Sequence, residues 1–102
     1  MRRNVPQPPD DQTLAALAVM GAHLRRERTR KDLTQEQAAE GLGIDGKYLA
    51  KIERGTVNIT VGTLLKLAEF YGVPASKLLR PGKPEPQRVG RPKKRFRASK
   101  LG

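Results

Sequence analysis

A chain of 102 residues, 36% of them hydrophobic and with two tyrosines and two phenylalanines as its aromatic residues, has room for one small domain with an aliphatic core. Because the chain contains no cysteine, disulfides and cysteine-based zinc sites are excluded, and no apolar run approaches the ~20 residues that span a bilayer. The formal net charge of +11 favours a polyanionic partner, most often nucleic acid. We expect no membrane partner and, because prolines interrupt the N-terminus, no secretory signal.

The basic residues are concentrated toward the C-terminus. Residues 80–102 carry nine basic residues and one acidic residue, whereas residues 13–79 carry ten basic and seven acidic residues. Residues 1–12 contain three prolines and little that a core could bury, so we expect disorder there. The chain is therefore predicted to have three parts: a disordered N-terminal arm over 1–12, a folded domain over 13–80, and a Pro-rich linker with a basic tail over 81–102.

The first predicted helix runs from Thr13 to about Lys31. One face of this helix carries four residues at helical spacing, Leu14, Leu17, Gly21 and Leu24. The stretch LRRERTRK in its second half places positive charge at the negative end of the helix dipole. The single histidine, His23, lies in this helix with no cysteine or second histidine to share a metal, so we expect a structural or solvent-facing role and no metal site.

The stretch from Thr34 to Gly55 predicts two short helices joined by a tight turn. Thr34 and Gln37 have the spacing of a capping box at the start of the first of these helices. Gly43 stands where the turn needs a positive φ, Asp45 is an N-cap candidate for the next helix, and Gly55 is placed to end it. Apolar residues recur at helical spacing on both sides of the turn, in Ala38, Ala39 and Leu42 before it and in Tyr48, Leu49 and Ile52 after it.

Two further helices are predicted to complete the domain. Thr60 can cap a helix from Val61 to Tyr71 that Gly72 ends. Its apolar positions are Val61, Leu64, Leu65, Leu67, Ala68 and Tyr71. Pro74 fits the first position of a short last helix that runs through Leu79. We expect Leu78 and Leu79 to fold back on the core.

This pattern resembles the Cro and lambda-repressor-like (Xre-type) helix-turn-helix family of DNA-binding proteins. The matching residues are Thr34-Gln35, Ala39, Gly43, Tyr48-Leu49 and Ile52-Glu53-Arg54-Gly55. The likeness extends over roughly Leu14 to Leu79, and it implies an all-α, compact five-helix domain. The stretch ERGTVNIT after the motif resembles small restriction–modification controller proteins, and phage or plasmid regulators share most of the same pattern.

The resemblance implies that the third helix, about Gly46 to Arg54, enters the ~12 Å major groove of DNA. Lys47 and Lys51 lie four residues apart on its outer side, where either can donate to guanine or to phosphate, and Ala50 can contact a thymine methyl group. Gly46 stands where the family usually presents a longer polar side chain. One direct base contact is therefore expected to be missing.

Contacts to the DNA backbone are implied around this helix. Gln35 occupies the position that fixes the second helix on a phosphate in the family, and a helix N-terminus itself favours an anion. Arg54, together with Thr56 and Asn58 in the following loop, would grip the backbone without reading sequence. Asp45 has two open roles, either capping the helix or accepting a hydrogen bond from a cytosine amino group.

The resemblance also implies an ion pair within the fold. In the family, an arginine seven residues before the glutamine of LTQ commonly pairs with the glutamate of IERG. Here these residues are Arg28 and Glu53, which would link the first helix to the third. The alternative is that both are solvated surface charges. The other residues expected to hold the motif together are Ala39, Gly43, Leu49 and Ile52.

The basic tail resembles a degenerate AT-hook, a short motif that enters A·T-rich minor grooves. Its residues are Gly90-Arg91-Pro92 followed by Lys93, Lys94 and Arg95. The family core has an arginine before the glycine, where this chain has Val89. Minor-groove insertion and phosphate contacts by a disordered polycation both remain open, and each would steepen the salt dependence of DNA binding. RNA or anionic lipid is a weaker alternative.

No catalytic set or phosphate-binding glycine pattern occurs, so we expect no enzyme, cofactor or small-molecule substrate. The expected function is that of a cytoplasmic, nucleoid-associated transcriptional regulator, most simply a repressor that binds double-stranded DNA. We expect a homodimer with half-sites ~34 Å apart, and the resemblance places its contact around Val73 to Lys77. Two alternatives remain: an antitoxin-type or adaptor protein whose main partner is another protein, and a nucleoid-type architectural DNA-binding protein.

Overall fold

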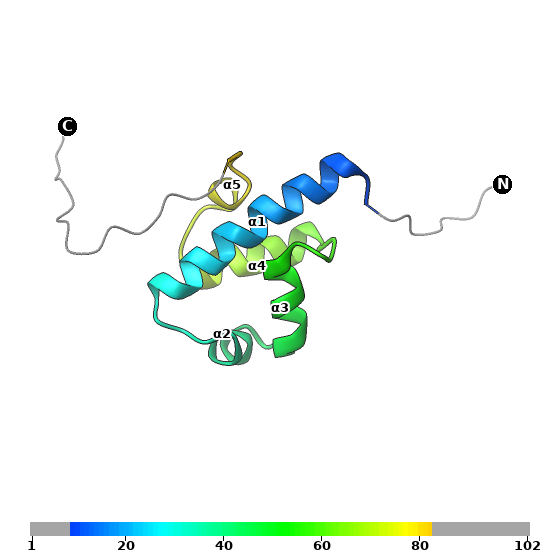
Figure 1. Cartoon of the computed structure of the whole chain (residues 1–102). Coiled ribbons are helices and arrows are strands. Elements are labelled where there is room, and N and C mark those ends of the chain that lie inside the picture. Colours follow the sequence, from blue (N-terminus) through cyan, green and yellow to red (C-terminus); the bar gives the residue numbers. More distant parts are fainter. Residues whose placement is uncertain (1–8, 83–102) are drawn as a thin grey trace, which may run out of the picture.

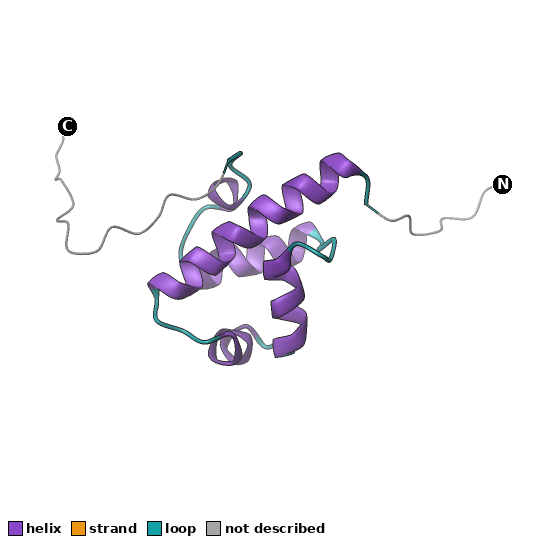
Figure 2. Ribbon diagram, viewed as in Figure 1, coloured by secondary structure: helices purple, strands orange, loops and turns teal. Residues whose placement is uncertain are grey.

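The computed structural model describes residues 9–82, and in this range the chain is all-helical (Figure 1, Figure 2). Helix α1 runs diagonally across the view, α4 lies behind it, and α2 and α3 lie below it (Figure 1). The five helices are α1 (Asp11–Arg30), α2 (Gln35–Leu42), α3 (Gly46–Arg54), α4 (Val61–Tyr71) and α5 (Ala75–Leu78). The predicted all-α, five-helix fold is confirmed. Residues 1–8 of the predicted arm and 83–102 of the predicted tail lie outside the described residues.

Side-chain caps explain where the first two helices begin. The Asp10 carboxylate accepts a hydrogen bond of 2.8 Å from the backbone N–H of Thr13. Helix α1 therefore starts at Asp11, earlier than the predicted Thr13, and its first residues belong to the stretch predicted as a disordered arm. Thr34 and Gln37 make both bonds of the capping box, at 3.0 and 2.9 Å, so α2 starts at its predicted position.

Glycine ends α2, α3 and α4 in the left-handed conformation. The φ angles are 74° at Gly43, 75° at Gly55 and 71° at Gly72. These local signals explain why the predicted bounds of α3 and α4 agree with the structure. Helix α5 is shorter than predicted, because Pro74 is its N-cap rather than its first residue and Leu79 is its C-cap.

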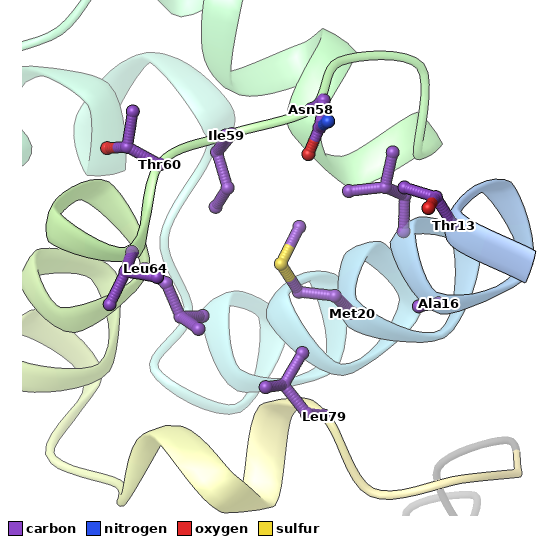
Figure 3. Close-up of a pocket in the computed structure, with 10 residues that line it drawn as sticks. Thr13, Ala16, Met20, Asn58, Ile59, Thr60, Leu64 and Leu79 are labelled. Carbon is purple, nitrogen blue, oxygen red and sulfur yellow. The ribbon is translucent and has the colours of Figure 1, made fainter. Parts of the chain in front are cut away.

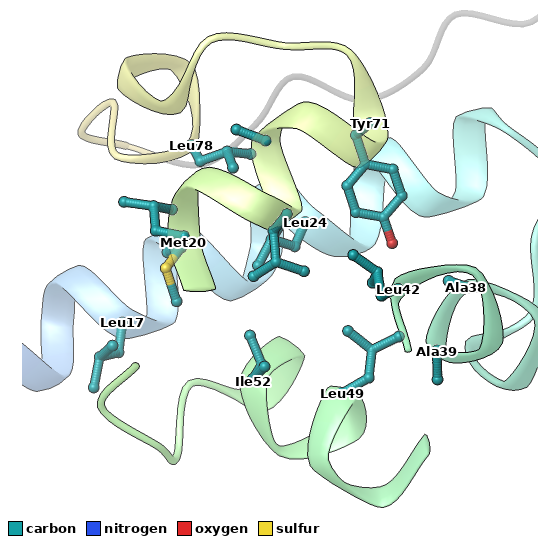
Figure 4. Packing of buried hydrophobic residues seen from close by; sticks show 13 residues of the cluster. Leu17, Met20, Leu24, Ala38, Ala39, Leu42, Leu49, Ile52, Tyr71 and Leu78 are labelled. Atoms are coloured by element: carbon teal, nitrogen blue, oxygen red, sulfur yellow. The ribbon is translucent and has the colours of Figure 1, made fainter. Parts of the chain in front are cut away.

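The core lies where α1, α3 and α4 meet, with α2 and α5 closing its ends (Figure 4). Leu49 and Ile52 point from α3 toward Leu24 of α1 and Leu42 of α2 (Figure 4). The buried apolar residues are Leu17, Met20, Leu24, Ala38, Ala39, Leu42, Leu49, Ile52, Leu64, Leu67, Ala68, Tyr71 and Leu78. Among the described helices, none combines the length and the apolar character needed to cross a membrane.

Four apolar residues that we expected to face the core are exposed. Leu14 in α1 and Leu79 after α5 are both more than two-fifths exposed. Val61 and Leu65 are more exposed still, because α4 buries the side of the helix that carries Leu64, Leu67, Ala68 and Tyr71. The hydrophobic periodicity of α4 is therefore broader than the face that the fold buries.

Two glycines let α1 approach the C-terminal end of α3 closely. A Cβ atom at Gly21 would lie 2.8 Å from the Ile52 carbonyl oxygen and closer still to that of Glu53. A Cβ atom at Gly55 would lie 2.9 Å from the Cα atom of Ala18. Since real Cβ atoms almost never come this near to backbone, no larger residue fits at either position without a shift of a helix. The orientation of α3 is set by this close approach.

Candidate nucleic-acid interface

A cluster of three polar side chains connects α1, α2 and α3. The Arg28 guanidinium donates to both carboxylate oxygens of Glu53, through Nε at 2.8 Å and Nη2 at 3.2 Å. Its Nη1 donates to the Leu33 carbonyl at 2.7 Å, in the connection between α1 and α2. The Gln35 amide donates to Glu53 Oε1 at 3.0 Å. The expected pair of Arg28 and Glu53 is thus present as part of a larger network.

The pair is largely removed from water. Glu53 is buried and the Arg28 side chain is 15% exposed. The hydrogen bonds to Glu53 raise the pKa of Arg28 above its ordinary value, although burial acts in the opposite direction. Because both charges are desolvated, removal of either partner would leave the other charge buried without compensation. The cluster therefore fixes the start of α2 and the last turn of α3 to α1.

The turn between α2 and α3 is held by its expected residues. Ala38 and Ala39 of α2 are both buried in the core. After Gly43 turns the chain, the Asp45 carboxylate accepts from the Lys47 backbone N–H at 3.1 Å and caps α3. The sequence leaves two roles open for Asp45, and in the structure it caps helix α3.

The outer side of α3 carries the proposed reading residues. Lys47, Lys51 and Arg54 are exposed and follow one another at i, i+4 and i+7, so they project from the same side of the helix. Ala50 and Gly46 are partly buried beside them. The inner side is formed by Leu49, Ile52 and Glu53, all of which are buried. A Cβ atom at Gly46 would meet no atom within 4 Å, so the missing side chain leaves open space at the start of α3.

The loop after α3 carries the two other residues that we expect to contact phosphate, Thr56 and Asn58. Thr56 is exposed, and its hydroxyl donates to the Lys51 carbonyl at 3.1 Å, which holds the start of the loop on the last turn of α3. Asn58 is exposed and also lines a hollow beside α1. Gln35 is partly buried at the opposite end of the motif. The four predicted tail residues, Arg91, Lys93, Lys94 and Arg95, lie outside the described residues.

A second buried ion cluster is not predicted by the sequence. Glu27 is only 2% exposed, and its carboxylate binds Arg30 at 3.0 Å and Lys77 at 3.2 Å. Burial opposes ionisation of Glu27, but the bonds from Arg30 and Lys77 outweigh it, and its pKa lies below the ordinary value. His23 Nε2 lies 3.2 Å from the Arg80 carbonyl oxygen, so α5 and the chain after it are tied to α1 at two points.

Of the two ion pairs in this cluster, one can be predicted from the sequence. Glu27 and Arg30 are spaced as helix neighbours, a spacing from which pairing can be proposed. Lys77 is far along the chain, and nothing local connects it to Glu27. The structure also places the Tyr71 hydroxyl in the core without a hydrogen-bond partner among the described residues, and burial raises the pKa of Tyr71 to about 12. Residues 9–82 contain no group of three or more acidic or histidine residues that could hold a metal.

The helix-turn-helix segment of this chain is similar in sequence to known proteins. A family model named HTH_3 and described as helix-turn-helix matches residues 24–78. The cryptic phage CTXphi transcriptional repressor RstR of Vibrio cholerae is 36% identical over 61 residues, which are 60% of this chain and 55% of RstR, so the chain spans about half the length of that relative. The uncharacterized HTH-type transcriptional regulator y4dJ of Sinorhizobium fredii is 40% identical over 63 residues, which are 62% of this chain and 82% of y4dJ.

A solved structure shows the same arrangement of helices. The restriction–modification controller protein C.AhdI from Aeromonas hydrophila superposes with a TM-score of 0.59 at 38% sequence identity. The superposition covers 63% of this chain and 97% of C.AhdI. The region shared with this controller protein therefore corresponds to most of the described domain.

Proposed function

The chain belongs to the HTH_3 helix-turn-helix family, and from this membership we propose that it is a sequence-specific DNA-binding transcriptional regulator and not an enzyme. One observation carries the proposal: the outer side of α3 presents Lys47, Lys51 and Arg54 to solvent, while its inner side is fixed in the core. A helix whose inner side is packed in the core and whose exposed side is basic is suited to enter the DNA major groove.

Helix α3 has the dimensions for this role. Its nine residues correspond to a length of ~13.5 Å at ~1.5 Å per residue, and the major groove is ~12 Å wide. Lys47 and Lys51 would donate to guanine O6 or N7, and Ala50 would contact a thymine methyl group. Gly46 has no side chain to offer to the bases, and the space beside it is open. Base readout then depends on few side chains, and DNA shape contributes the rest.

Contacts to phosphate would surround the reading helix. The Gln35 amide nitrogen carries two hydrogens, and Glu53 takes one of them, which leaves the other for a phosphate oxygen at the start of α2. Arg54, Thr56 and Asn58 would bind the backbone at the other end of α3. Asp45 stays engaged in its cap. Such contacts would position α3 in the groove without reading sequence.

The tail would add affinity without adding much sequence preference. Arg91, Lys93, Lys94 and Arg95 would contact phosphates or enter a minor groove next to the site bound by α3. On this proposal the folded domain, which begins with α1 at Asp11, directs binding, and the basic segment over 81–102 strengthens it. The relatives named as a repressor and as a controller protein support regulation of transcription by occupancy of promoter DNA.

A homodimer on a palindromic operator completes the proposal. One domain makes few base contacts, and two copies bound to half-sites ~34 Å apart would double them. The family resemblance places the contact between the copies around Val73 to Lys77. The two alternatives make different predictions: an adaptor would bind a protein partner more tightly than any DNA, and an architectural protein would bind all DNA alike.

The test is binding of the full chain to the DNA upstream of its own gene and to a shuffled DNA of equal length, measured by fluorescence anisotropy across a series of salt concentrations. We expect at least tenfold tighter binding to the upstream DNA. Replacing Arg91, Lys93, Lys94 and Arg95 together by alanine should weaken binding to both DNAs and lower the log–log salt slope by ~0.9 for each phosphate that is no longer neutralised. Equal affinity for the two DNAs would contradict the regulator and favour the architectural protein.

A further inference from the structure

Helix α5 has little stability of its own. It consists of four residues, and its N-cap, Pro74, makes no side-chain hydrogen bond to it. A single helical turn without a cap does not persist in water, because nucleation costs more than so few hydrogen bonds contribute. Helix α5 therefore exists only while it is docked on the rest of the domain, and the contacts that dock it decide whether it forms.

The apolar packing of α5 is incomplete. Leu78 is fully buried, and Ala75 is partly buried against the core. The residue after the helix, Leu79, is 49% exposed, and it lines a hollow of about 170 Å³ together with Met20 of α1. Leu79 points toward Met20 without closing the space between them (Figure 3). Contacts other than apolar packing are therefore needed to hold α5 on α1.

Two polar contacts supply this, and both come from one turn of α1. The Lys77 Nζ atom lies 3.2 Å from Glu27 Oε2. His23 Nε2 lies 3.2 Å from the Arg80 carbonyl oxygen, and because a carbonyl oxygen only accepts, this ring nitrogen donates. His23 and Glu27 are four residues apart, so they project from the same side of α1. The segment from Lys77 to Arg80 is thus fixed at both ends to one side of α1.

The bond from Lys77 to Glu27 is the contact on which docking depends. Glu27 is buried, and its two cations bind different oxygens, Arg30 at Oε1 and Lys77 at Oε2. A carboxylate removed from water needs partners for its remaining lone pairs. Arg30 belongs to α1 and stays in place whatever α5 does, whereas Lys77 is present only when α5 is docked. Docking without the Lys77 amine would leave Oε2 desolvated and unpaired.

Helix α5 also determines where the basic segment leaves the domain. It lies on the opposite side of α1 from α3 (Figure 1), because its partners on α1 are His23 and Glu27, whereas α3 meets Gly21 and Arg28. A helix with its side chains is ~10–12 Å across. A chain that starts beside docked α5 therefore has to pass α1 to reach the DNA that α3 is proposed to bind.

The docked helix keeps the tether to the tail short. Arg91 is nine residues after Gly82, the last described residue, and 19 residues after Gly72, where α4 ends. Nine extended residues span ~30 Å, which is enough to pass one helix. Detachment of α5 would lengthen the tether from nine to 19 residues. Because the effective concentration of a tethered group falls roughly as the −3/2 power of tether length, detachment would lower it ~threefold.

We propose that Glu27 is a positioning residue for DNA binding: through Lys77 it docks α5, and docked α5 fixes the start of the basic segment. The proposal rests on the proposed function for the contact of the tail with DNA. Helix α5 is then a latch that opens while α1 to α4 stay folded. When the latch is closed, the tail cations stay near the DNA that α3 binds, and when it is open they are tethered only at the end of α4.

The first test compares Lys77→Met with Arg30→Met. Each variant removes one cation from the same carboxylate and one positive charge from the chain, but only Lys77 belongs to α5. The two side chains are 37% and 45% exposed, so neither change should unfold the domain. In Lys77→Met we expect ~tenfold faster amide hydrogen exchange at Leu79 and Arg80, whose N–H groups bond to carbonyls of α5. In Arg30→Met these rates should stay within ~twofold of wild type.

The exchange is followed by NMR at one pH, with the amides inside α4 as the internal reference. Three results would overturn the proposal. Unprotected Leu79 and Arg80 amides in the wild type would show that α5 is not docked. Equal exchange in the two variants would show that docking does not depend on Lys77. Loss of protection in α4 together with α5 would show that the latch does not open separately from the domain.

The second test asks whether the latch acts through the tail. Binding of both variants to shuffled DNA is measured by fluorescence anisotropy at one salt concentration, where their equal net charge makes them comparable. We expect Lys77→Met to bind ~threefold more weakly than Arg30→Met. The difference should vanish in chains that lack the tail cations, because no basic group is then left to position. These chains carry alanine in place of Arg91, Lys93, Lys94 and Arg95.

Equal binding of the two variants in the full chain would overturn the proposal. So would a difference that persists without the tail cations, since Lys77 would then act on DNA directly or on a contact between copies. Both results are separable from failure of the proposed function, which concerns preference for upstream over shuffled DNA. A wild-type chain without that preference rejects the regulator, whereas a chain that has it but shows no tail-dependent difference keeps the regulator and rejects the latch.

Discussion

The two sides of helix α3 differ in burial: one lies in the core and the other faces solvent. On the inner side, Leu49, Ile52 and Glu53 are buried and bound to the surrounding helices through packing and hydrogen bonds. On the outer side, Lys47 and Lys51 are exposed. The inner side therefore determines where the helix lies, and the outer side is free to change without cost to the fold. We expect stability to depend on the first set of residues and DNA affinity on the second.

The largest effect on stability is expected from Glu53→Ala. It leaves the Arg28 guanidinium largely buried without its partner and removes the acceptor of Gln35. Removing one partner from a buried pair costs ~3–5 kcal/mol of unfolding free energy. Urea denaturation of the variant measures this cost, with Glu40→Ala, an exposed glutamate of α2, as the control that should change stability by less than ~0.5 kcal/mol. A similar small change for both variants would mean that the pair is effectively solvated.

A smaller difference in stability is expected between the alanine variants of two glycines that have the same backbone conformation. Gly55 and Gly72 both have positive φ, so alanine at either position costs ~1–2 kcal/mol in backbone strain. Only at Gly55 does the new Cβ also meet backbone, that of Ala18 in α1, whereas at Gly72 it meets nothing within 4 Å. We therefore expect Gly55→Ala to be ~1–3 kcal/mol more destabilising than Gly72→Ala in thermal or urea unfolding. Equal destabilisation by the two variants would show that α1 moves away from α3 without cost.

The features that the sequence predicts correctly are those that local chemistry decides. The bounds of α3 and α4 follow from Asp45, Thr60, Gly55 and Gly72, each of which acts on its own helix end. The exposure of Val61 and Leu65 could not be predicted, because both fit the hydrophobic periodicity that places Leu64 in the core. Which of several apolar sides a helix buries depends on where the other helices lie.

The candidate site shows the same distinction between features that local sequence predicts and features that depend on how distant segments pack. The pair of Arg28 and Glu53 is predicted through family resemblance, since residues 25 positions apart have no spacing that predicts contact. The resemblance assigns Gln35 to a phosphate, whereas its bond to Glu53 is seen only in the structure. Neither a local sequence pattern nor the family resemblance predicts the ion pair of Glu27 with Lys77. It depends on the packing of α5 on α1, which is seen only in the structure.

A pH-dependent effect is expected at Glu27, which is buried on the inner side of α1. Its pKa is lower in the folded chain than in the unfolded chain, so its ionised form stabilises the fold above the ordinary glutamate pKa of about 4.3. That contribution is lost as the pH falls through the lower, folded-state pKa. Wild-type stability should therefore fall more steeply between about pH 5 and pH 3 than that of Glu27→Gln, measured by urea unfolding. Parallel pH profiles for the two proteins would contradict this assignment.

The smallest effect on stability, and the largest on DNA binding, is expected on the outer side of α3. Lys47→Ala with Lys51→Ala removes two exposed side chains and should change the unfolding free energy by less than ~0.5 kcal/mol. The same double variant should lose ~1–3 kcal/mol of binding to its upstream DNA for each base contact removed, or ~5- to 150-fold in affinity for one. Lys66→Ala, an exposed lysine of α4, controls for the removal of positive charge alone.

Anisotropy titration of the double variant, the control and the wild type against upstream and shuffled DNA is the most direct test of α3 as the reading helix. We predict that the double variant loses its preference for the upstream DNA, while the Lys66→Ala chain keeps it and both remain folded. A double variant that retains both affinity and preference would show that another part of the chain reads the DNA.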